Sequence, residues 1–185
     1  GDGNVDPGEE CDDGSSLCVD CMLIPPAGWR RCTDADGNVV FFLLEDWAGV
    51  HSQSAMAEHC GQIIEALAPE GFLDYGLAVL TDESVWACIR AALDASRQYY
   101  IGLAQQAGGD EPAGGWVWVA YDGTAWVEVG ACDFSSWFFP SVVDNAAGEG
   151  DADCGRIAHD GTRWNFWDYG CDSEEDWDGI CMIRF

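Results

Sequence analysis

The chain has 185 residues, enough for one full domain and a short appendage but too few for two ordinary domains. Hydrophobic residues make up 48% of it, which allows a sizeable core and excludes wholesale disorder. Against 7 Lys and Arg stand 34 Asp and Glu, a formal charge of −27 that excludes electrostatic binding to nucleic-acid phosphates or to an anionic membrane. Such a surface favours cations as partners, or salty surroundings that screen its self-repulsion.

The chain contains ten Cys and no run that could span a membrane. An even number of Cys predicts disulfides and an oxidising compartment, so we expect the protein to be secreted or held at the cell surface. The longest apolar run, residues 39–44, is far too short to cross a membrane, and no membrane insertion is expected. Because the sequence has neither an initiator Met nor a signal peptide, we expect its export signal to lie outside it.

The first elements in chain order are a strand and two helices. Residues 1–20 are rich in Gly, Asp and Cys and cannot form a core, so disulfides or metal must hold them. Residues 39–44 are predicted to form a buried strand after a turn at Asp36-Gly37. Apolar residues at helical spacing predict two helices, the second capped by Thr81 or Asp82. Their apolar faces are Met56, Cys60, Ile63, Ile64 and Leu67, and then Val85, Trp86, Ile89 and Leu93.

Short strands and one long loop follow the helices. The strands are predicted over residues 99–103, 116–121, 125–129, 156–158, 163–167 and 180–185. Asp122-Gly123 and Asp160-Gly161 lie where hairpin turns are expected. Residues 130–153 have no clear period, and a loop of this length in a compact domain usually has a function. Two helices followed by strands predict an α+β domain.

Several motifs in this order resemble the C-type lectin-like domain. Tyr100-Ile-Gly-Leu103 and Trp116-Val-Trp-Val119 resemble its Trp-Ile-Gly-Leu and Trp-x-Trp signatures. Cysteines at the expected places are Cys60, Cys154, Cys171 and Cys181. The resemblance covers residues 21–185 and implies an α+β, C-type lectin-like fold: two helices and short antiparallel sheets, with a long irregular binding loop and disulfide staples. Residues 1–14 resemble cysteine-rich repeats of bacterial surface proteins, so residues 1–20 are taken as a separate N-terminal segment of bacterial extracellular origin.

The resemblance also implies how the cysteines pair. It links the first helix to the last strand through Cys60–Cys181 and braces the binding loop through Cys154–Cys171. Longer members of the family carry an extra bridge that Cys21–Cys32 would match. Cys88–Cys132 and Cys11–Cys18 then complete the set.

The spacing of Cys18-Val-Asp-Cys21 also occurs in redox and zinc motifs. Four thiolates, from Cys11, Cys18, Cys21 and Cys32, could hold zinc. Disulfides are the favoured interpretation, because nothing in the sequence indicates a reducing compartment.

Oxygen-bearing residues alternate in the N-terminal segment. Asp2, Asn4 and Asp6, followed by Glu10, resemble the first half of a calcium-binding loop, in which alternate side chains converge on one hard cation. The alternative is a solvated acidic turn, and Pro7 stands where such a loop has Gly. Asp34, Asp36 and Asn38 show the same alternation, but a hairpin turn explains it.

The calcium and sugar site of the family is altered in this chain. Its loop tripeptide falls near residues 142–145, where Asp144 and Asn145 offer oxygen, but the family's Glu position is Ala152. The Trp-Asn-Asp position is Phe166-Trp167-Asp168, so only the Asp is kept. We therefore expect a different calcium site, because a crowd of carboxylates repels itself unless it is hydrated or binds a cation. Its candidate ligands are Asp144, Asn145, Glu149, Asp151, Asp153 and Asp168. The alternative is a highly charged face without metal.

Aromatic residues surround the same region and could form a ligand-binding surface, because flat rings cover sugar or protein faces at little entropic cost. The candidates are Trp137, Trp164, Trp167 and Tyr169. Catalysis has little support: the chain has no nucleophile elbow, phosphate loop or dinucleotide motif, and we expect no enzymatic activity. His51, His59 and His159 lack the spacing of a helical metal site and are interpreted as non-catalytic.

These observations predict an extracellular recognition or adhesion domain. It would bind a glycan or a cell-surface protein through the long loop, with Ca²⁺ as the organiser of that loop. A second hypothesis is a calcium-independent domain that binds a protein partner through its aromatic residues. A third and weaker one is a small secreted hydrolase that uses pairs of carboxylates.

Overall fold

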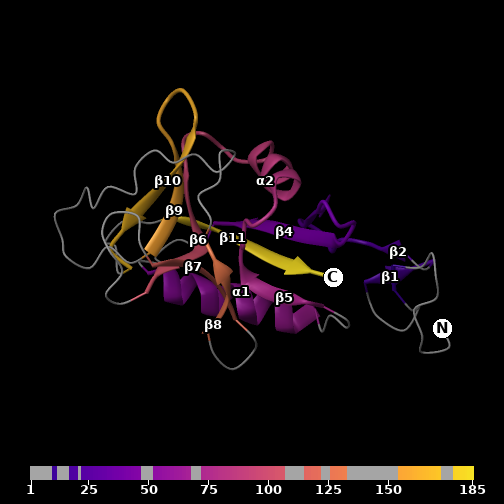
Figure 1. Ribbon diagram of the computed structural model, residues 1–185. Coiled ribbons are helices and arrows are strands. Elements are labelled where there is room, and N and C mark those ends of the chain that lie inside the picture. Colours follow the sequence, from indigo (N-terminus) through magenta and orange to yellow (C-terminus); the bar gives the residue numbers. More distant parts are fainter. Residues whose placement is uncertain are drawn as a thin grey trace.

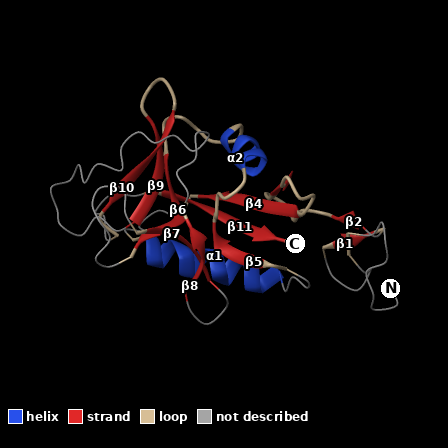
Figure 2. Cartoon of the chain, viewed as in Figure 1, coloured by secondary structure: helices blue, strands red, loops and turns tan. Residues whose placement is uncertain are grey.

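A computed structural model of the chain describes residues 10–11, 17–20, 22–46, 52–67, 72–106, 115–121, 126–132, 154–171 and 177–185. Within these residues the structure has two helices and eleven strands (Figure 1 and Figure 2). Strands β1 (Cys18–Val19) and β2 (Met22–Leu23) form a small hairpin beside the body of the molecule. The remaining strands form one mixed sheet.

The sheet is centred on β11, which antiparallel neighbours flank on both sides. Its strands are β3 (Arg30–Thr33), β4 (Val39–Glu45), β5 (Asp74–Leu77), β6 (Gln98–Gln105), β7 (Trp116–Tyr121), β8 (Trp126–Ala131), β9 (Cys154–His159), β10 (Trp164–Tyr169) and β11 (Asp178–Arg184). The order is β10-β9-β6-β7-β5-β11-β4-β3, and β8 pairs with β7. One end of β6 also pairs in parallel with the start of β11. Strand β6 is therefore a branch point of the sheet: it pairs with β7 and β11 near the centre and with the β9–β10 hairpin at the edge.

The two helices cover opposite faces of this sheet (Figure 1). Val40 and Phe42 of β4 join the core that contains α2 (Glu83–Arg90), whereas Val39 and Phe41 join the core that contains α1 (Gln53–Leu67). All four side chains are at most 5% exposed. The apolar run is unbroken because both faces of this strand are buried.

A side-chain oxygen caps the N-terminus of each helix, and a cap was expected from the sequence only for the second. The Ser52 hydroxyl accepts a hydrogen bond from the N–H of Ala55 (3.1 Å), and the Asp82 carboxylate accepts from the N–H groups of Ser84 and Val85. Asp82, and not Thr81, is therefore the cap of α2, which ends at Arg90 before Leu93. In the part of the chain that the structure describes, neither helix has the length and apolar character needed to cross a membrane.

The predicted strands are present, with ends that differ by a few residues. Strands β3 and β5 were not predicted, because each has four residues and neither shows a sustained apolar pattern. The hairpin turn at Asp36-Gly37 is confirmed, with Gly37 at φ +92°, where glycine is favoured. The Asp34 carboxylate accepts hydrogen bonds from the N–H groups of Asp36 and Asn38 inside this turn, which accounts for the alternating oxygens there. Asp122-Gly123 lies outside the described residues.

Glu10 attaches the N-terminal segment to the domain. Its carboxylate accepts a hydrogen bond from the Leu23 N–H (3.0 Å) and forms an ion pair with Arg31 of β3. Leu23 is 3% exposed and packs in the core that contains Trp29. Asp2, Asn4 and Asp6 lie outside the described residues, and the domain boundary after residue 20 stays a prediction that falls in the β1–β2 turn.

Four disulfides lie within the described residues. They are Cys11–Cys18, Cys32–Cys88, Cys60–Cys181 and Cys154–Cys171. Three of these pairs were expected.

The expected Cys21–Cys32 and Cys88–Cys132 bridges are wrong, because Cys32 is bonded to Cys88. The reason is that β3 packs against α2, which brings the two Cα atoms to 6.1 Å. Three of the four thiolates proposed as zinc ligands, those of Cys11, Cys18 and Cys32, are consumed by disulfides, and this overturns the zinc alternative.

We expect all ten Cys of the native protein to be oxidised in pairs. Denaturation and reduction should therefore raise the intact mass by ten hydrogens. Mass spectrometry before and after reduction checks this. Alkylation of several Cys without prior reduction would contradict it.

Candidate functional site

The expected binding loop leaves the sheet after β8 and returns to it at β9. Just after β8, the N–H of Cys132 donates to the carbonyl of Trp116 (2.9 Å). At the other end, Cys154 opens β9 and is bonded to Cys171, just beyond β10. Both ends of the loop are thus fixed to the sheet. The expected loop residues Asp144, Asn145, Glu149, Asp151, Asp153 and Trp137 lie outside the described residues.

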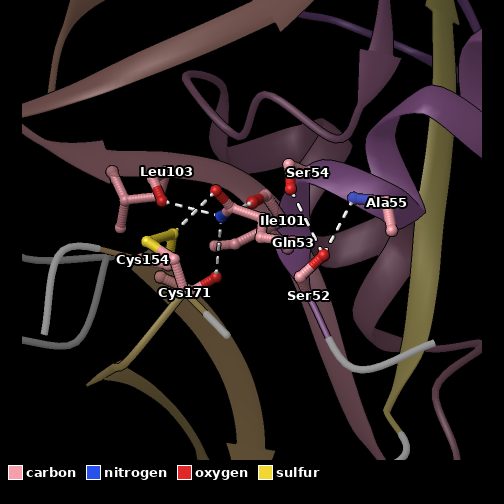
Figure 3. The surroundings of a disulfide bond; sticks show 9 residues. Ser52, Gln53, Ser54, Ala55, Ile101, Leu103, Cys154 and Cys171 are labelled. Carbon is pink, nitrogen blue, oxygen red and sulfur yellow. Dashed lines mark hydrogen bonds between the residues drawn. A yellow bond between two sulfur atoms is a disulfide. The ribbon is translucent and has the colours of Figure 1, made fainter. Parts of the chain in front are cut away.

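Gln53, at the start of α1, ties the base of this loop together (Figure 3). Its side chain is buried, and its Nε2 donates to the carbonyls of Ile101 (2.6 Å) and Leu103 (3.0 Å) in β6. Its Oε1 lies 3.1 Å from the Sγ of Cys154, and its backbone N–H donates to the carbonyl of Cys171 (3.1 Å). This one residue of α1 therefore contacts both β6 and the disulfide at the C-terminal end of the loop.

The β9–β10 hairpin is held by its turn. The Asp160 carboxylate accepts hydrogen bonds from the Thr162 hydroxyl, from the N–H groups of Thr162 and Arg163, and from the Asn165 side-chain amide. These bonds, led by that of the Thr162 hydroxyl, hold the pKa of Asp160 far below its usual range. The predicted hairpin turn at Asp160-Gly161 is confirmed, with Gly161 at φ +93°.

Asp168 is the expected metal ligand that the structure describes. It lies on β10 opposite Gly155 of β9, and it is 4% exposed. Trp164, Phe166 and Asp168 alternate on one face of β10, and the first two join the core around α2. Asp168 continues this face toward Cys171, at the base of the long loop. Within the described ranges no three His, Cys, Asp or Glu side chains gather as a metal site, and the other expected ligands of Asp168's site lie outside those ranges.

The expected aromatic residues divide between core and surface. Trp164 is 8% exposed and packs against Tyr99 and His159, so it belongs to the core and its assignment to the binding surface is corrected. Trp167 points to the other face of β10 and is half-buried. Its indole nitrogen is buried and has no acceptor within the described residues. Trp167 therefore remains a candidate ligand contact.

Tyr169 belongs to an aromatic cluster that encloses an arginine. Its ring lies edge-on to Trp177 (4.8 Å), which also contacts Tyr100 (5.0 Å). The Arg156 guanidinium lies 4.5 Å from the Tyr169 ring centre and 4.4 Å from that of Trp177. Cation–π contacts of this kind stabilise by about 0.5–2 kcal/mol. Tyr169 thus attaches the hairpin to the start of β11, and its expected role in binding stays a prediction.

Gln53, Arg156 and Trp177 were not singled out from the sequence. Gln53 had a signal: it lies three residues before Met56 and seven before Cys60, which puts this polar residue on the apolar face of α1. Arg156 and Trp177 had none, because their contact joins segments that only the fold brings together. The His59 ring lies 3.0 Å from the Glu45 carboxylate, and the His159 ring accepts a hydrogen bond from the Gly161 N–H. Both rings therefore make contacts that support the fold. His51 lies outside the described residues.

The fold resembles solved C-type lectin domains. It aligns with the C-type lectin domain of murine dendritic cell inhibitory receptor 2, solved in complex with an N-glycan, at a TM-score of 0.54 and 18% identity over 86% of this chain and 98% of that one. The carbohydrate-recognition domain of mouse scavenger receptor C-type lectin gives 0.52 and 16%, over 85% and 95%. The EPNH mutant of CEL-I gives 0.50 and 14%, over 88% and 98%. No protein-family model matches the sequence, and no curated protein is significantly similar to it.

The chain therefore has the C-type lectin-like fold, with two helices and a mixed, mainly antiparallel sheet stapled by disulfides. At these identities the similarity establishes the fold alone. What the chain binds is an inference from its own residues.

Proposed function

We propose that this protein is an extracellular recognition domain that binds a glycan through the long loop and the adjacent β10 strand, with Ca²⁺ as the organiser of the loop. The observation that carries the proposal is Asp168, a carboxylate 4% exposed near the Cys154–Cys171 bridge, which fixes the C-terminal end of the loop. Neighbours in fold include a lectin domain solved with an N-glycan and a carbohydrate-recognition domain.

The donor set suits a hard cation. Calcium takes six to eight oxygen ligands, and carboxylates are its strongest protein ligands. Asp168 would supply one, and Asp144, Asn145, Glu149, Asp151 and Asp153 are the proposed others. A cation bound there would neutralise part of the local charge and favour the ordered loop over alternatives.

Trp167 indicates that sugar would contact this chain differently from the way the resemblance implies. It stands where the resemblance expects an Asn ligand, so direct coordination of sugar hydroxyls by calcium would lose an oxygen at this position. Its half-buried ring instead offers an apolar surface to the flat face of a sugar. We infer weak binding of simple mannose or galactose and a dependence of glycan binding on Trp167, and on Trp137 in the loop.

Four disulfides support an oxidising environment, and we infer secretion or display at a cell surface. Bacterial origin and a role in adhesion stay part of this proposal. A calcium-independent domain that binds a cell-surface protein is the second candidate, which Trp167 in place of a calcium ligand favours.

Asp168→Asn is expected to weaken Ca²⁺ binding by at least tenfold, because it removes one charged ligand while keeping the side chain's shape. The wild-type melting temperature should rise with calcium and fall with chelator, and in the variant this response should shrink. Titration calorimetry and thermal melting with and without chelator measure both effects. Asp36→Asn, an exposed residue of the β3–β4 turn, is the charge-matched control and should leave the response unchanged.

Glycan arrays with calcium and with chelator then test the ligand. Signal that chelator abolishes supports the proposal. Binding to a protein that chelator does not affect would favour the second candidate, and turnover of a glycoside panel would overturn both. A wild-type melting temperature that does not respond to chelator would refute the proposal that Ca²⁺ orders the loop.

A further inference from the structure

The pairing of β6 with β9 contains an irregularity next to the candidate site. Tyr100 pairs with Arg156, but the next pair joins Ala104 to Cys154, so three residues of β6 face one residue of β9. The carbonyls of Ile101 and Leu103 lie within this bulge and receive no strand partner from β9. A buried carbonyl without a donor destabilises the folded state. The bulge therefore needs a donor from outside the sheet.

Gln53 supplies that donor from α1. Both hydrogens of its Nε2 are used, one for Ile101 and one for Leu103, and the carbonyl of Gly155 lies 3.5 Å away on β9. The reversed amide would place Oε1 against the same carbonyl oxygens, so the carbonyls themselves fix its orientation. The side chain is 5% exposed, which removes water as a competitor.

The contacts of Gln53 reach the segments that carry Asp168. Gly155, next to the amide, is the strand partner of Asp168, and Cys171, whose carbonyl accepts from the Gln53 N–H, ends the same segment. The Gln53 Oε1 touches Cys154, the other half of the disulfide. Displacing this amide would let β9, Cys171 and therefore the Asp168 carboxylate shift relative to α1.

We propose that Gln53 is a positioning residue: its amide fills the β6–β9 bulge, holds the Cys154–Cys171 bridge against α1, and thereby sets the place of Asp168 at the loop base. The calcium half of this inference rests on the proposed function. The bridge half does not, because it concerns the fold alone.

Gln53→Met tests the inference, because it keeps length and volume but leaves both carbonyls without a donor. Reduction of Cys154–Cys171 by a phosphine, followed by alkylation and peptide mass spectrometry, is expected to be about tenfold faster than in wild type, while Cys60–Cys181 keeps its rate. The Kd for Ca²⁺ is expected to rise about tenfold. The matched control is Gln62→Met, which replaces an exposed glutamine of the same helix whose amide donates to Glu58, and it should change neither quantity.

Gln53→Glu adds a pH readout. Burial and the facing carbonyl oxygens should raise the pKa of the new carboxyl group, and only its protonated form can donate to one of the carbonyls. Its Cys154–Cys171 reduction rate should therefore approach that of wild type as the pH falls from about 8 to about 5, whereas the Gln53→Met rate should stay high relative to wild type.

Equal acceleration of both disulfides in Gln53→Met would show a general loss of stability and overturn the inference, as would unchanged rates. A faster reduction of Cys154–Cys171 with an unchanged Kd would overturn the claim that Gln53 positions Asp168. If the wild type binds no Ca²⁺, the proposed calcium site fails, and the reduction rates alone decide the role of Gln53.

Discussion

Replacing both Cys60 and Cys181 with Ala is expected to lower the free energy of unfolding by about 5 kcal/mol. The bridge joins residues 121 positions apart, and the entropy it removes from the unfolded chain grows with the logarithm of that length. It also connects α1 to the central strand β11, and both residues are fully buried. Equilibrium denaturation measures the loss, and the melting temperature should fall by about 10–20 °C.

The Cys154→Ala/Cys171→Ala variant provides the comparison. Its bridge closes only 17 positions, so the expected loss is about 3 kcal/mol. Ca²⁺ affinity should instead fall more in the Cys154→Ala/Cys171→Ala variant, because only that bridge holds the hairpin that carries Asp168 and the C-terminal end of the loop. A larger stability loss from the shorter bridge would contradict the chain-entropy argument.

Elements with a strong apolar period were predictable from the sequence, and contacts between elements were not. The buried strand β4 and both helices follow directly from apolar spacing and caps. The Cys32–Cys88 bridge depends on β3, whose residues Arg30–Thr33 show no strand pattern, packing beside α2. Pairing by resemblance failed for these cysteines because no local feature of the sequence encodes that contact.

The candidate site shows the same division. Asp168 could be placed by its distance from Cys171, because a short segment fixes the geometry. Trp164 and Trp167 could not be assigned to core or surface, since β10 carries aromatic residues on both faces and alternation alone does not say which face is buried. Gln53 could have been suspected as a polar residue on an apolar helix face, but its partners, Ile101 and Leu103, become visible only when the bulge in β6 is known.

Gly102→Ala is expected to destabilise the protein by about 3 kcal/mol or more. A Cβ at this position would lie 2.5 Å from the carbonyl oxygen of Val119 and 3.0 Å from that of Leu77. Both contacts are backbone atoms of neighbouring strands, so no side chain can rotate away to make room. The glycine in the Tyr100-Ile-Gly-Leu103 motif is therefore required by the close approach of β5 and β7 to β6.

Gly102 and Gln53 act on opposite sides of the same bulge, and this gives the substitution a second expected effect. The N–H of Gly102 donates to Ala78 (2.9 Å), whereas the carbonyls on either side of it turn toward Gln53. An added methyl group would push β6 toward Gln53, disturb those two bonds and speed the reduction of Cys154–Cys171. Gly130→Ala on β8 is the control, because its Cβ would meet nothing within 4 Å, and its stability should change by no more than about 0.5 kcal/mol. Chemical denaturation of both variants decides the matter: equal stabilities would mean that β6 can move away from β7 at little cost, and the tight packing inferred for this bulge would be wrong.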